Sequence, residues 1–213
     1  MVFDLDGVLI DSEAAWDEAR RELVGERGGS WRPEAQRAMM GMSSGEWSRY
    51  MRDELGVPMS SEAISNEVVA RLERRFRERL PLIDGAREAV ERLAGGWRLG
   101  LASSASRPII DLALREAGLA DRFAATVSSE EVARGKPAPD VYLEAARRLA
   151  ADPARCVAVE DSSNGLRSAA AAGMGVIAIP NRAFPPDPDA VALADVVLAS
   201  IDALDPAVVA GLD

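Results

Sequence analysis

Two carboxylates near the start of the chain have a spacing that suits metal binding or acid–base chemistry. Asp4 and Asp6 are separated by one residue and followed by Gly7. Alternate side chains of an extended strand point to the same side, so both carboxylates come close together, and Gly7 lets the chain turn directly afterwards. Carboxylates at such range share a proton or bind a hard cation such as Mg²⁺. Ordinary turns also use this pattern, which is the alternative interpretation.

The residue types that are missing narrow the chemistry. The chain has 213 residues, no histidine and a single cysteine, Cys156. Serine triads with histidine, His-ligated zinc and histidine acid–base catalysis are therefore excluded. Cys156 lies in an apolar run and has no partner for an internal disulfide, so we expect a buried side chain and a reducing, cytoplasmic environment. Carboxylates, lysine, serine and metal–oxygen chemistry remain.

Charge and hydropathy exclude several classes of partner. The net charge is −10, because 25 Lys and Arg residues stand against 35 Asp and Glu residues. Phosphate-rich partners would be repelled, so nucleic acid and anionic membranes are not expected. No apolar run approaches the ~18 residues of a membrane span, and Asp4 and Asp6 interrupt any leader pattern at once. The length is typical of one large domain, or of a core with a smaller insertion.

Short apolar runs that alternate with helical patterns predict a parallel sheet. Strands are expected at residues 1–3, 98–102, 123–127, 156–159, 176–179 and 196–198, and helices at 86–94, 108–117, 140–150 and 163–172. This alternation is typical of an α/β, Rossmann-like core with helices on both faces, whose site lies at the carboxyl ends of the strands. The polar residues that follow those ends are Asp4, Asp6, Ser103, Ser104, Ser128, Ser129, Glu160 and Asp161.

Residues 14–80 follow a different pattern. Trp16, Ala19 and Leu23 fall at helical spacing, and apolar residues recur at every fourth position between residues 62 and 80. Glycine and proline at 41–45 and 56–58 break the stretch into short helices. We therefore expect an all-helical insertion at 14–80, within a core domain formed by residues 1–13 and 81–213.

Four segments resemble, in order, the motifs of the haloacid dehalogenase-like (HAD) hydrolase superfamily. They are Asp4-Leu5-Asp6-Gly7-Val8-Leu9-Ile10-Asp11-Ser12, Ser103 at the end of the second strand, Lys136 in Gly135-Lys136-Pro137, and Glu160-Asp161-Ser162-Ser163-Asn164-Gly165. The branch it resembles most is the beta-phosphoglucomutase-like group, in which a cap lies between the first motif and the second strand. The helical insertion would then be the cap domain.

The resemblance implies Mg²⁺-dependent phosphoryl transfer. Asp4 would be the nucleophile that forms an aspartyl-phosphate, and Asp6 the general acid and then base, with its backbone carbonyl toward the metal. Asp4 and Asp161 would bind the metal directly, and Glu160 through a metal-bound water. Lys136 would offset the charge of the phosphate.

The remaining phosphate contacts follow from the same resemblance. Ser103 would donate a hydrogen bond, and Gly7, Ser104 and, from the cap, Ser44 would complete the phosphate site. Each residue alone has a structural explanation: Lys136 as a surface lysine, Ser103 and Ser104 as a helix cap. Their joint occurrence favours the catalytic interpretation.

The choice of reaction depends on the cap. Mutases of this branch have a histidine where this chain has Trp16 and a cap arginine where it has Ser44; Arg49, one turn beyond, is a substitute or an exposed residue. We therefore expect a phosphatase that acts on small phosphomonoesters such as sugar phosphates, as a monomer or weak homodimer. A phosphomutase is the alternative, and a catalytically silent binding protein is less favoured.

The cap is expected to move. Its two connections to the core would let it close and exclude water, with hinges at Asp11-Ser12 and at Pro81. Dehalogenation is disfavoured, because the branch that performs it lacks the second acid of the first motif, here Asp6.

Overall fold

The computed structural model describes residues 1–212 and contains one six-stranded sheet. Its strands are β1 (Val2–Phe3), β2 (Leu99–Ser103), β3 (Phe123–Ser128), β4 (Val157–Glu160), β5 (Gly175–Ala178) and β6 (Val196–Val197). Every neighbouring pair is parallel, in the order β3-β2-β1-β4-β5-β6. The order changes direction between β1 and β4, which opens a crevice at the carboxyl ends of these two strands. The predicted Rossmann-like α/β core is confirmed.

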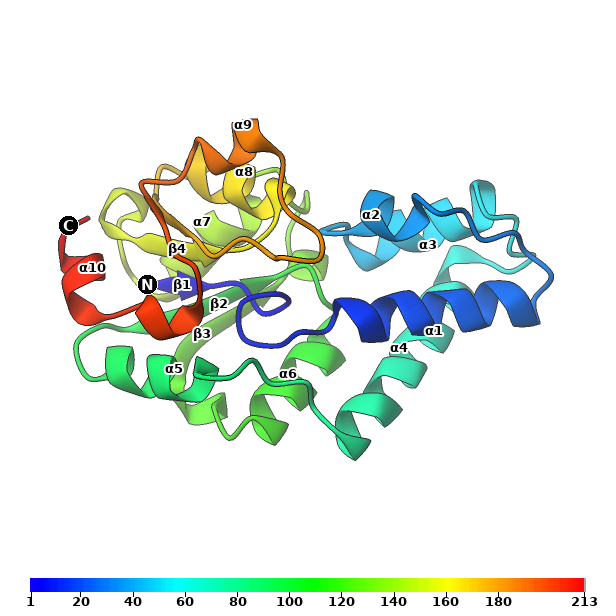
Figure 1. Cartoon of the computed structure of the whole chain (residues 1–213), viewed down its shortest axis with the longest axis horizontal. Coiled ribbons are helices and arrows are strands. Elements are labelled where there is room, and N and C mark those ends of the chain that lie inside the picture. Colours follow the sequence, from blue (N-terminus) through cyan, green and yellow to red (C-terminus); the bar gives the residue numbers. More distant parts are fainter. Residues whose placement is uncertain (213) are drawn as a thin grey trace.

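Helices cover both faces of this sheet (Figure 1). The core helices are α5 (Ala86–Ala94), α6 (Arg107–Glu116), α7 (Asp140–Arg148), α8 (Ser163–Ala171), α9 (Pro188–Val191) and α10 (Pro206–Ala210). Short 3-10 turns occupy Ala120–Arg122, Ser129–Glu131, Pro153–Arg155 and Ile201–Ala203.

Alternation along the strands divides the core into two apolar layers. Phe3 and Leu101 belong to the layer under α5 and α6, whereas Val2 and Ala158 belong to the layer under α7 and α8. All four residues are fully buried, as expected for parallel strands covered on both faces. Cys156 is buried in the second layer without a disulfide partner, as predicted from its apolar surroundings.

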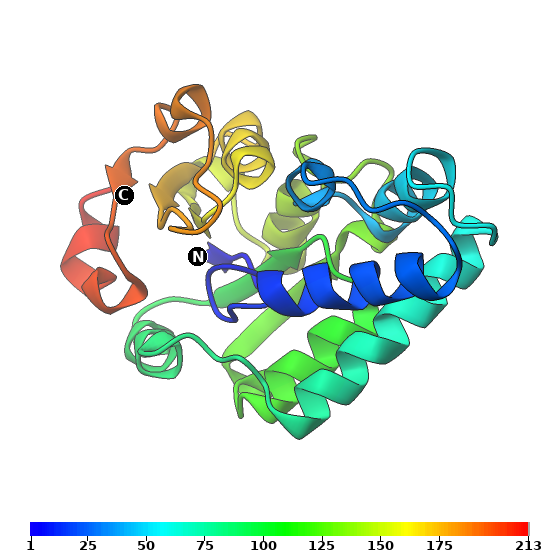
Figure 2. The same cartoon turned by 45° about the vertical axis from the view of Figure 1, so that its right-hand side comes forward.

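The helical insertion lies beside the carboxyl edge of the sheet (Figures 1 and 2). It consists of α1 (Glu13–Glu26), α2 (Ala35–Met39), α3 (Ser44–Asp53) and α4 (Ser61–Glu78). Ser43 and Glu46 form a capping box at the start of α3, and Ser60 accepts a bond from the amide of Ala63 at the start of α4. Leu23 of α1 and Leu72 of α4 belong to one apolar cluster that continues under α6.

The two connections between insertion and core lie against each other. The amide of Asp11 donates to the carbonyl of Pro81 at 2.8 Å, and the amide of Ile83 donates to the carbonyl of Leu9 at 2.9 Å. The backbone therefore enters and leaves the insertion at one place. Hinges at Asp11-Ser12 and Pro81 stay a prediction, as does the division into domains at residues 13/14 and 80/81. No helix within residues 1–212 is both long and apolar enough to cross a bilayer.

The packing of α4 gives a stability prediction. Leu72 is fully buried, so Leu72→Ala removes apolar contacts and leaves a cavity that we expect to lower the free energy of unfolding by about 2–5 kcal/mol in urea denaturation. Leu143→Ala in α7, where the side chain is 40% exposed, is the matched control and should cost less than about 1 kcal/mol. Equal losses in the two variants would contradict this account of the core.

Candidate active site

The strand ends bring together the polar residues that the sequence singled out. Asp4 follows β1 directly, and its amide donates to the carbonyl of Val159 in β4 at 3.0 Å. Ser103 is the last residue of β2, Glu160 is the last residue of β4, and Asp161 comes next. These residues therefore meet at the crevice between β1 and β4.

Three buried carboxylates form a cluster in this crevice. Asp4, Glu160 and Asp161 each offer an oxygen, and these oxygens lie within 4.8 Å of one another. Burial, together with the negative charges of Glu160 and Asp6, raises the pKa of Asp4 to about 8. The positive charge of Lys136 lowers this pKa but does not cancel the rise. Burial and the charges of Glu160 and Asp4 also raise the pKa of Asp161 well above its usual range. Accumulated negative charge and hard oxygen donors fit a divalent cation such as Mg²⁺.

Lys136 is the cation that the cluster already contains. Its Nζ lies 2.9 Å from Oδ1 of Asp4 and also donates to Oε1 of Glu160, and the side chain is 3% exposed. Burial alone would lower the pKa of Lys136, but Asp4 and Glu160 together raise it above its usual range, so the lysine stays charged. Tyr142 donates from its hydroxyl to the same Oε1 at 2.7 Å.

Glu160 holds this arrangement in place. Its Oε2 accepts from the backbone amides of Asp161 at 3.1 Å and Ser162 at 3.4 Å. Gly165 of α8 leaves room for the carboxylate, because a Cβ there would lie 1.9 Å from Glu160 Oε2. Glu160 thus fixes Lys136, and its predicted contact with a metal through water stays a prediction.

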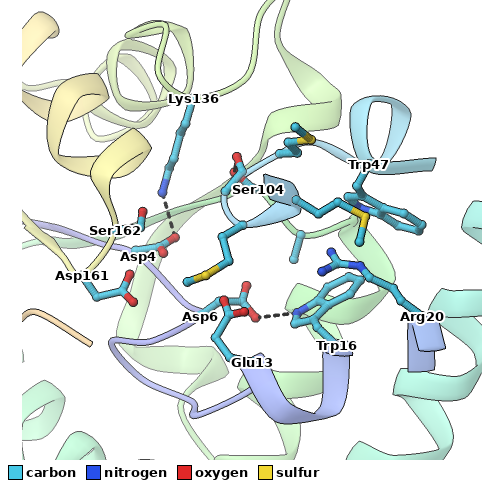
Figure 3. A pocket seen from close by; sticks show the side chains of 15 residues that line it. Asp4, Asp6, Glu13, Trp16, Arg20, Trp47, Ser104, Lys136, Asp161 and Ser162 are labelled. Carbon is cyan, nitrogen blue, oxygen red and sulfur yellow. Dashed lines mark hydrogen bonds and ion pairs between the residues drawn. The ribbon is translucent and has the colours of Figure 1, made fainter. Parts of the chain in front are cut away.

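Asp6 points away from the carboxylate cluster. Its Oδ1 accepts from Nε1 of Trp16 at 3.1 Å (Figure 3). The same oxygen accepts from the hydroxyl of Ser12, and Ser103 Oγ donates to Oδ2 at 3.4 Å. The predicted role of Asp6 as a metal ligand concerns its backbone carbonyl and stays a prediction. The sequence analysis gave Trp16 as part of a helical apolar pattern and as the replacement of a histidine, whereas in the structure its indole also donates to Asp6.

The phosphate contacts predicted from the sequence do not all converge. Gly7 lies against Asp161, Ser103 is fully buried beside Asp6, and Ser104 Oγ donates to the carbonyl of Gly41 in the insertion at 3.0 Å. Ser44 is separate: it lines a surface pocket between α3 and α4 together with Arg49. The cavity beside Asp4 does not include Ser44 or Arg49 among its lining residues.

That cavity, which we call the active-site cavity, lies between the sheet edge and the insertion (Figure 3). It is lined by Asp4, Asp6, Glu13, Trp16, Arg20, Met39, Met40, Gly41, Met42, Trp47, Ser104, Ala105, Lys136, Asp161 and Ser162. Glu13 and Arg20 were missed in the sequence analysis. The sequence pattern could have found them, because both fall on the same face of α1 as Trp16 and Leu23. Charged residues are rare on the buried face of a helix unless they are paired or have a function.

Comparison with known proteins agrees with this geometry. Residues 1–173 match the family model of the haloacid dehalogenase-like hydrolases. Hexitol phosphatase B of Escherichia coli is 36% identical over 95% of this chain and 92% of its own length. A phosphorylated carbohydrates phosphatase of Thermotoga maritima is 32% identical over 82% of this chain and 81% of its own. A crystal structure of a CbbY mutant from Rhodobacter sphaeroides with xylulose-(1,5)bisphosphate is 30% identical, with a TM-score of 0.85 over 100% of this chain and 97% of that one.

The turn after Asp6 gives a test of the carboxylate cluster. Gly7 has φ +81°, and a Cβ there would lie 1.9 Å from Oδ2 of Asp161. Gly7→Ala should displace this carboxylate and weaken Mg²⁺ binding by about 10-fold or more in titration calorimetry. In Gly28→Ala the φ is similar, +74°, but the new Cβ has open space, so only stability should fall. Unchanged Mg²⁺ affinity in folded Gly7→Ala would contradict the placement of Asp161.

The carboxylate of Glu13 gives a pH prediction. Burial raises its pKa from 4.5 to about 7, although Arg20 opposes this. The native state then binds the proton more tightly than the unfolded chain, so this group lowers stability as pH rises from about 4.5 through 7. Glu13→Gln removes the effect and should be increasingly more stable than wild type between pH 5 and 8, by up to about 3 kcal/mol in urea denaturation without metal. A difference that stays constant with pH would argue against it.

Proposed function

This chain belongs to the haloacid dehalogenase-like hydrolase family and is a phosphatase, and we propose that its substrates are small phosphorylated sugars or polyols. We further propose that it hydrolyses them with Mg²⁺, through an aspartyl-phosphate on Asp4. The observation that carries the proposal is the position of Asp4. Its carboxylate accepts from a charged, buried lysine, and oxygens of Glu160 and Asp161 lie within 4.8 Å of it. A nucleophilic carboxylate needs this environment, because an anionic phosphate approaches it only where positive charge offsets the repulsion.

Asp4, Asp161 and the backbone carbonyl of Asp6 would hold the metal. When bound, Mg²⁺ supplies positive charge beside the phosphoryl oxygens. Lys136 Nζ supplies a second positive charge at Asp4, and Glu160, which accepts from Tyr142, keeps this lysine in place. The hydroxyl of Ser103 would donate to a phosphate oxygen, whereas the amide of Gly7 donates to the carbonyl of Ile10 at 2.7 Å and would have to give up that bond first.

The reaction then proceeds in two steps, formation of the aspartyl-phosphate and its hydrolysis. An oxygen of Asp4 forms a bond to phosphorus, the bond from phosphorus to the substrate's ester oxygen breaks, and Asp6 gives its proton to that oxygen. Asp6 next takes a proton from water, whose oxygen attacks the phosphorus and releases phosphate and the free carboxylate of Asp4. Ser12 and Trp16 hold Asp6 in the orientation that both proton transfers require.

We propose that residues 14–80 act as a cap domain. The active-site cavity lies between these residues and the core, with Ser104 and Gly41 in contact across it. Paired connections at Asp11 and Pro81 are compatible with motion of the insertion about one place, and closure would exclude water from the phosphoryl transfer.

Two observations favour phosphate release over phosphate transfer within a bisphosphate. Trp16, at the position where mutases of the branch have histidine, donates to Asp6 and adds no positive charge. Ser44 and Arg49 lie together outside the active-site cavity, so Arg49 does not replace the cap arginine there. The names of the relatives in Escherichia coli and Thermotoga maritima support a sugar or polyol phosphate as substrate. A phosphomutase is the second candidate, because phosphatases and phosphomutases of this branch have the same core.

Phosphate release tests the proposal. We expect release from sugar and polyol monophosphates with Mg²⁺, and loss of at least about 1000-fold with EDTA or in Asp4→Asn, which keeps the shape of the side chain but removes the nucleophile. Asp121→Asn changes an exposed carboxylate that does not line the active-site cavity and is the control, with activity near wild type. Release by Asp4→Asn at the wild-type rate would refute the role of Asp4, whereas interconversion of hexose phosphates with a bisphosphate primer would favour the mutase.

A further inference from the structure

Two buried charged residues of α1 have no part in the chemistry described so far. Arg20 of α1 is 4% exposed and Glu13 of the same helix is 9% exposed, yet both line the active-site cavity. Figure 3 shows Glu13 beside Asp6 and Arg20 across the cavity from Asp161, so the two residues line the part of the cavity that extends from Asp6 into the insertion. Charged side chains are seldom buried unless they are paired or used.

Arg20 is held firmly but is not satisfied. Its guanidinium carbon lies 4.6 Å from the centre of the Trp16 ring and 5.1 Å from that of Trp47, so the cation packs against both indoles. Nη1 donates to Oε1 of Gln36 at 3.1 Å. Within the described chain no acceptor reaches Nε, although this atom is buried, and no carboxylate forms an ion pair with the guanidinium.

Gln36 connects Arg20 to Glu13. While its oxygen accepts from Arg20, its Nε2 donates to Oε2 of Glu13 at 2.7 Å. One wall of the cavity therefore presents donors from Arg20 and an acceptor from Glu13, both oriented by a single amide. Glu13 also opposes the charge of Arg20, and each shifts the pKa of the other toward its charged form against burial.

This donor and acceptor set matches a neutral hydroxyl better than an anion. A hydroxyl group donates and accepts at once, so it can bridge Arg20 and Glu13. A second phosphate would need several unopposed positive charges, but Arg20 and Lys136 are the cationic residues in the lining, and Lys136 is engaged by Asp4 and Glu160. Met39, Met42 and Trp47 supply apolar surface beside the pair.

We propose that Arg20 and Glu13, oriented by Gln36, bind hydroxyl groups of the leaving group and thereby select phosphorylated polyols or sugars that carry one phosphate over bisphosphates. The proposal rests on the proposed phosphatase function and deepens it, because it assigns the recognition of the substrate to α1 of the insertion.

The test compares a substrate rich in hydroxyl groups with one that has none and with one that carries a second phosphate. We would measure kcat and KM for sorbitol 6-phosphate, butyl phosphate and fructose 1,6-bisphosphate with wild type and Arg20→Met, whose uncharged side chain can still pack against the indoles. Kcat/KM for sorbitol 6-phosphate should fall roughly 10- to 100-fold, mainly through KM, whereas the value for butyl phosphate should change less than about 3-fold. Arg20→Lys, which keeps the charge but loses the planar fork, should give a smaller loss of the same kind.

Arg21→Met is the matched control. Arg21 is the next residue of α1, has a side chain 54% exposed and pairs with Asp17 outside the cavity, so its loss should leave all three values unchanged. Equal losses for sorbitol 6-phosphate and butyl phosphate in both Arg20 variants would overturn the proposal in favour of a purely structural role. Preference of the wild type for the bisphosphate, lost in Arg20→Met, would overturn it in favour of a second phosphate site.

Binding separates this inference from the proposed function. Calorimetry of sorbitol 6-phosphate with the Asp4→Asn protein, with and without Arg20→Met, needs no turnover. Weaker binding in the double variant supports the hydroxyl site even if the wild type releases no phosphate, a result that would refute the phosphatase alone. Equal binding by both proteins would refute the hydroxyl site whatever the activity.

Discussion

Three buried carboxylates share a single buried lysine at the carboxyl edge of this sheet, and the site depends on that balance. Lys136 contacts Asp4 and Glu160, but Asp161 adds a third negative charge that this lysine does not offset. Desolvation makes such an excess costly, so a divalent cation or protons must join the cluster. A cation that joins the cluster would place Asp4 between two positive charges, its own and that of Lys136, which suits a carboxylate that must meet an anionic phosphate. Glu160 holds Lys136 there, and Tyr142 and the backbone amides of Asp161 and Ser162 hold Glu160.

The backbone explains why these groups meet. The parallel order places β1 between β2 and β4, so side chains that are far apart in the sequence end at one edge: Asp4, Ser103 and Glu160. The two connections at Asp11 and Pro81 then bring α1 over the same edge, and Trp16 reaches Asp6 from the insertion. Core and insertion thus contribute to one site, the core through the phosphoryl chemistry and α1 through the orientation of Asp6 and, as we propose, the recognition of the leaving group.

Local patterns predicted most of the fold, because strand ends and helix starts are set by nearby residues. The expected strands and core helices agree with the structure to within one or two residues, as with 98–102 against Leu99–Ser103 and 140–150 against Asp140–Arg148. The carboxylates were predictable for the same reason, since each follows a strand. Glu13, Arg20 and Gln36 were not, because their partnership depends on how α1 packs against α2. The resemblance placed Ser44 at the phosphate, because it stands where mutases of the branch have a cap arginine. In the structure Ser44, at the start of α3, lines a separate pocket.

The central claim is that Asp4 carries the phosphoryl group during turnover, and reductive trapping tests it most directly. Borohydride added during turnover reduces an acyl phosphate to the alcohol, so an aspartyl-phosphate becomes homoserine, which peptide mass spectrometry locates. The account predicts homoserine at position 4, formed only with substrate and Mg²⁺ and absent in Asp4→Asn. Reduction at Asp6 or Asp161 instead, or an unmodified Asp4 under conditions of rapid phosphate release, would contradict it.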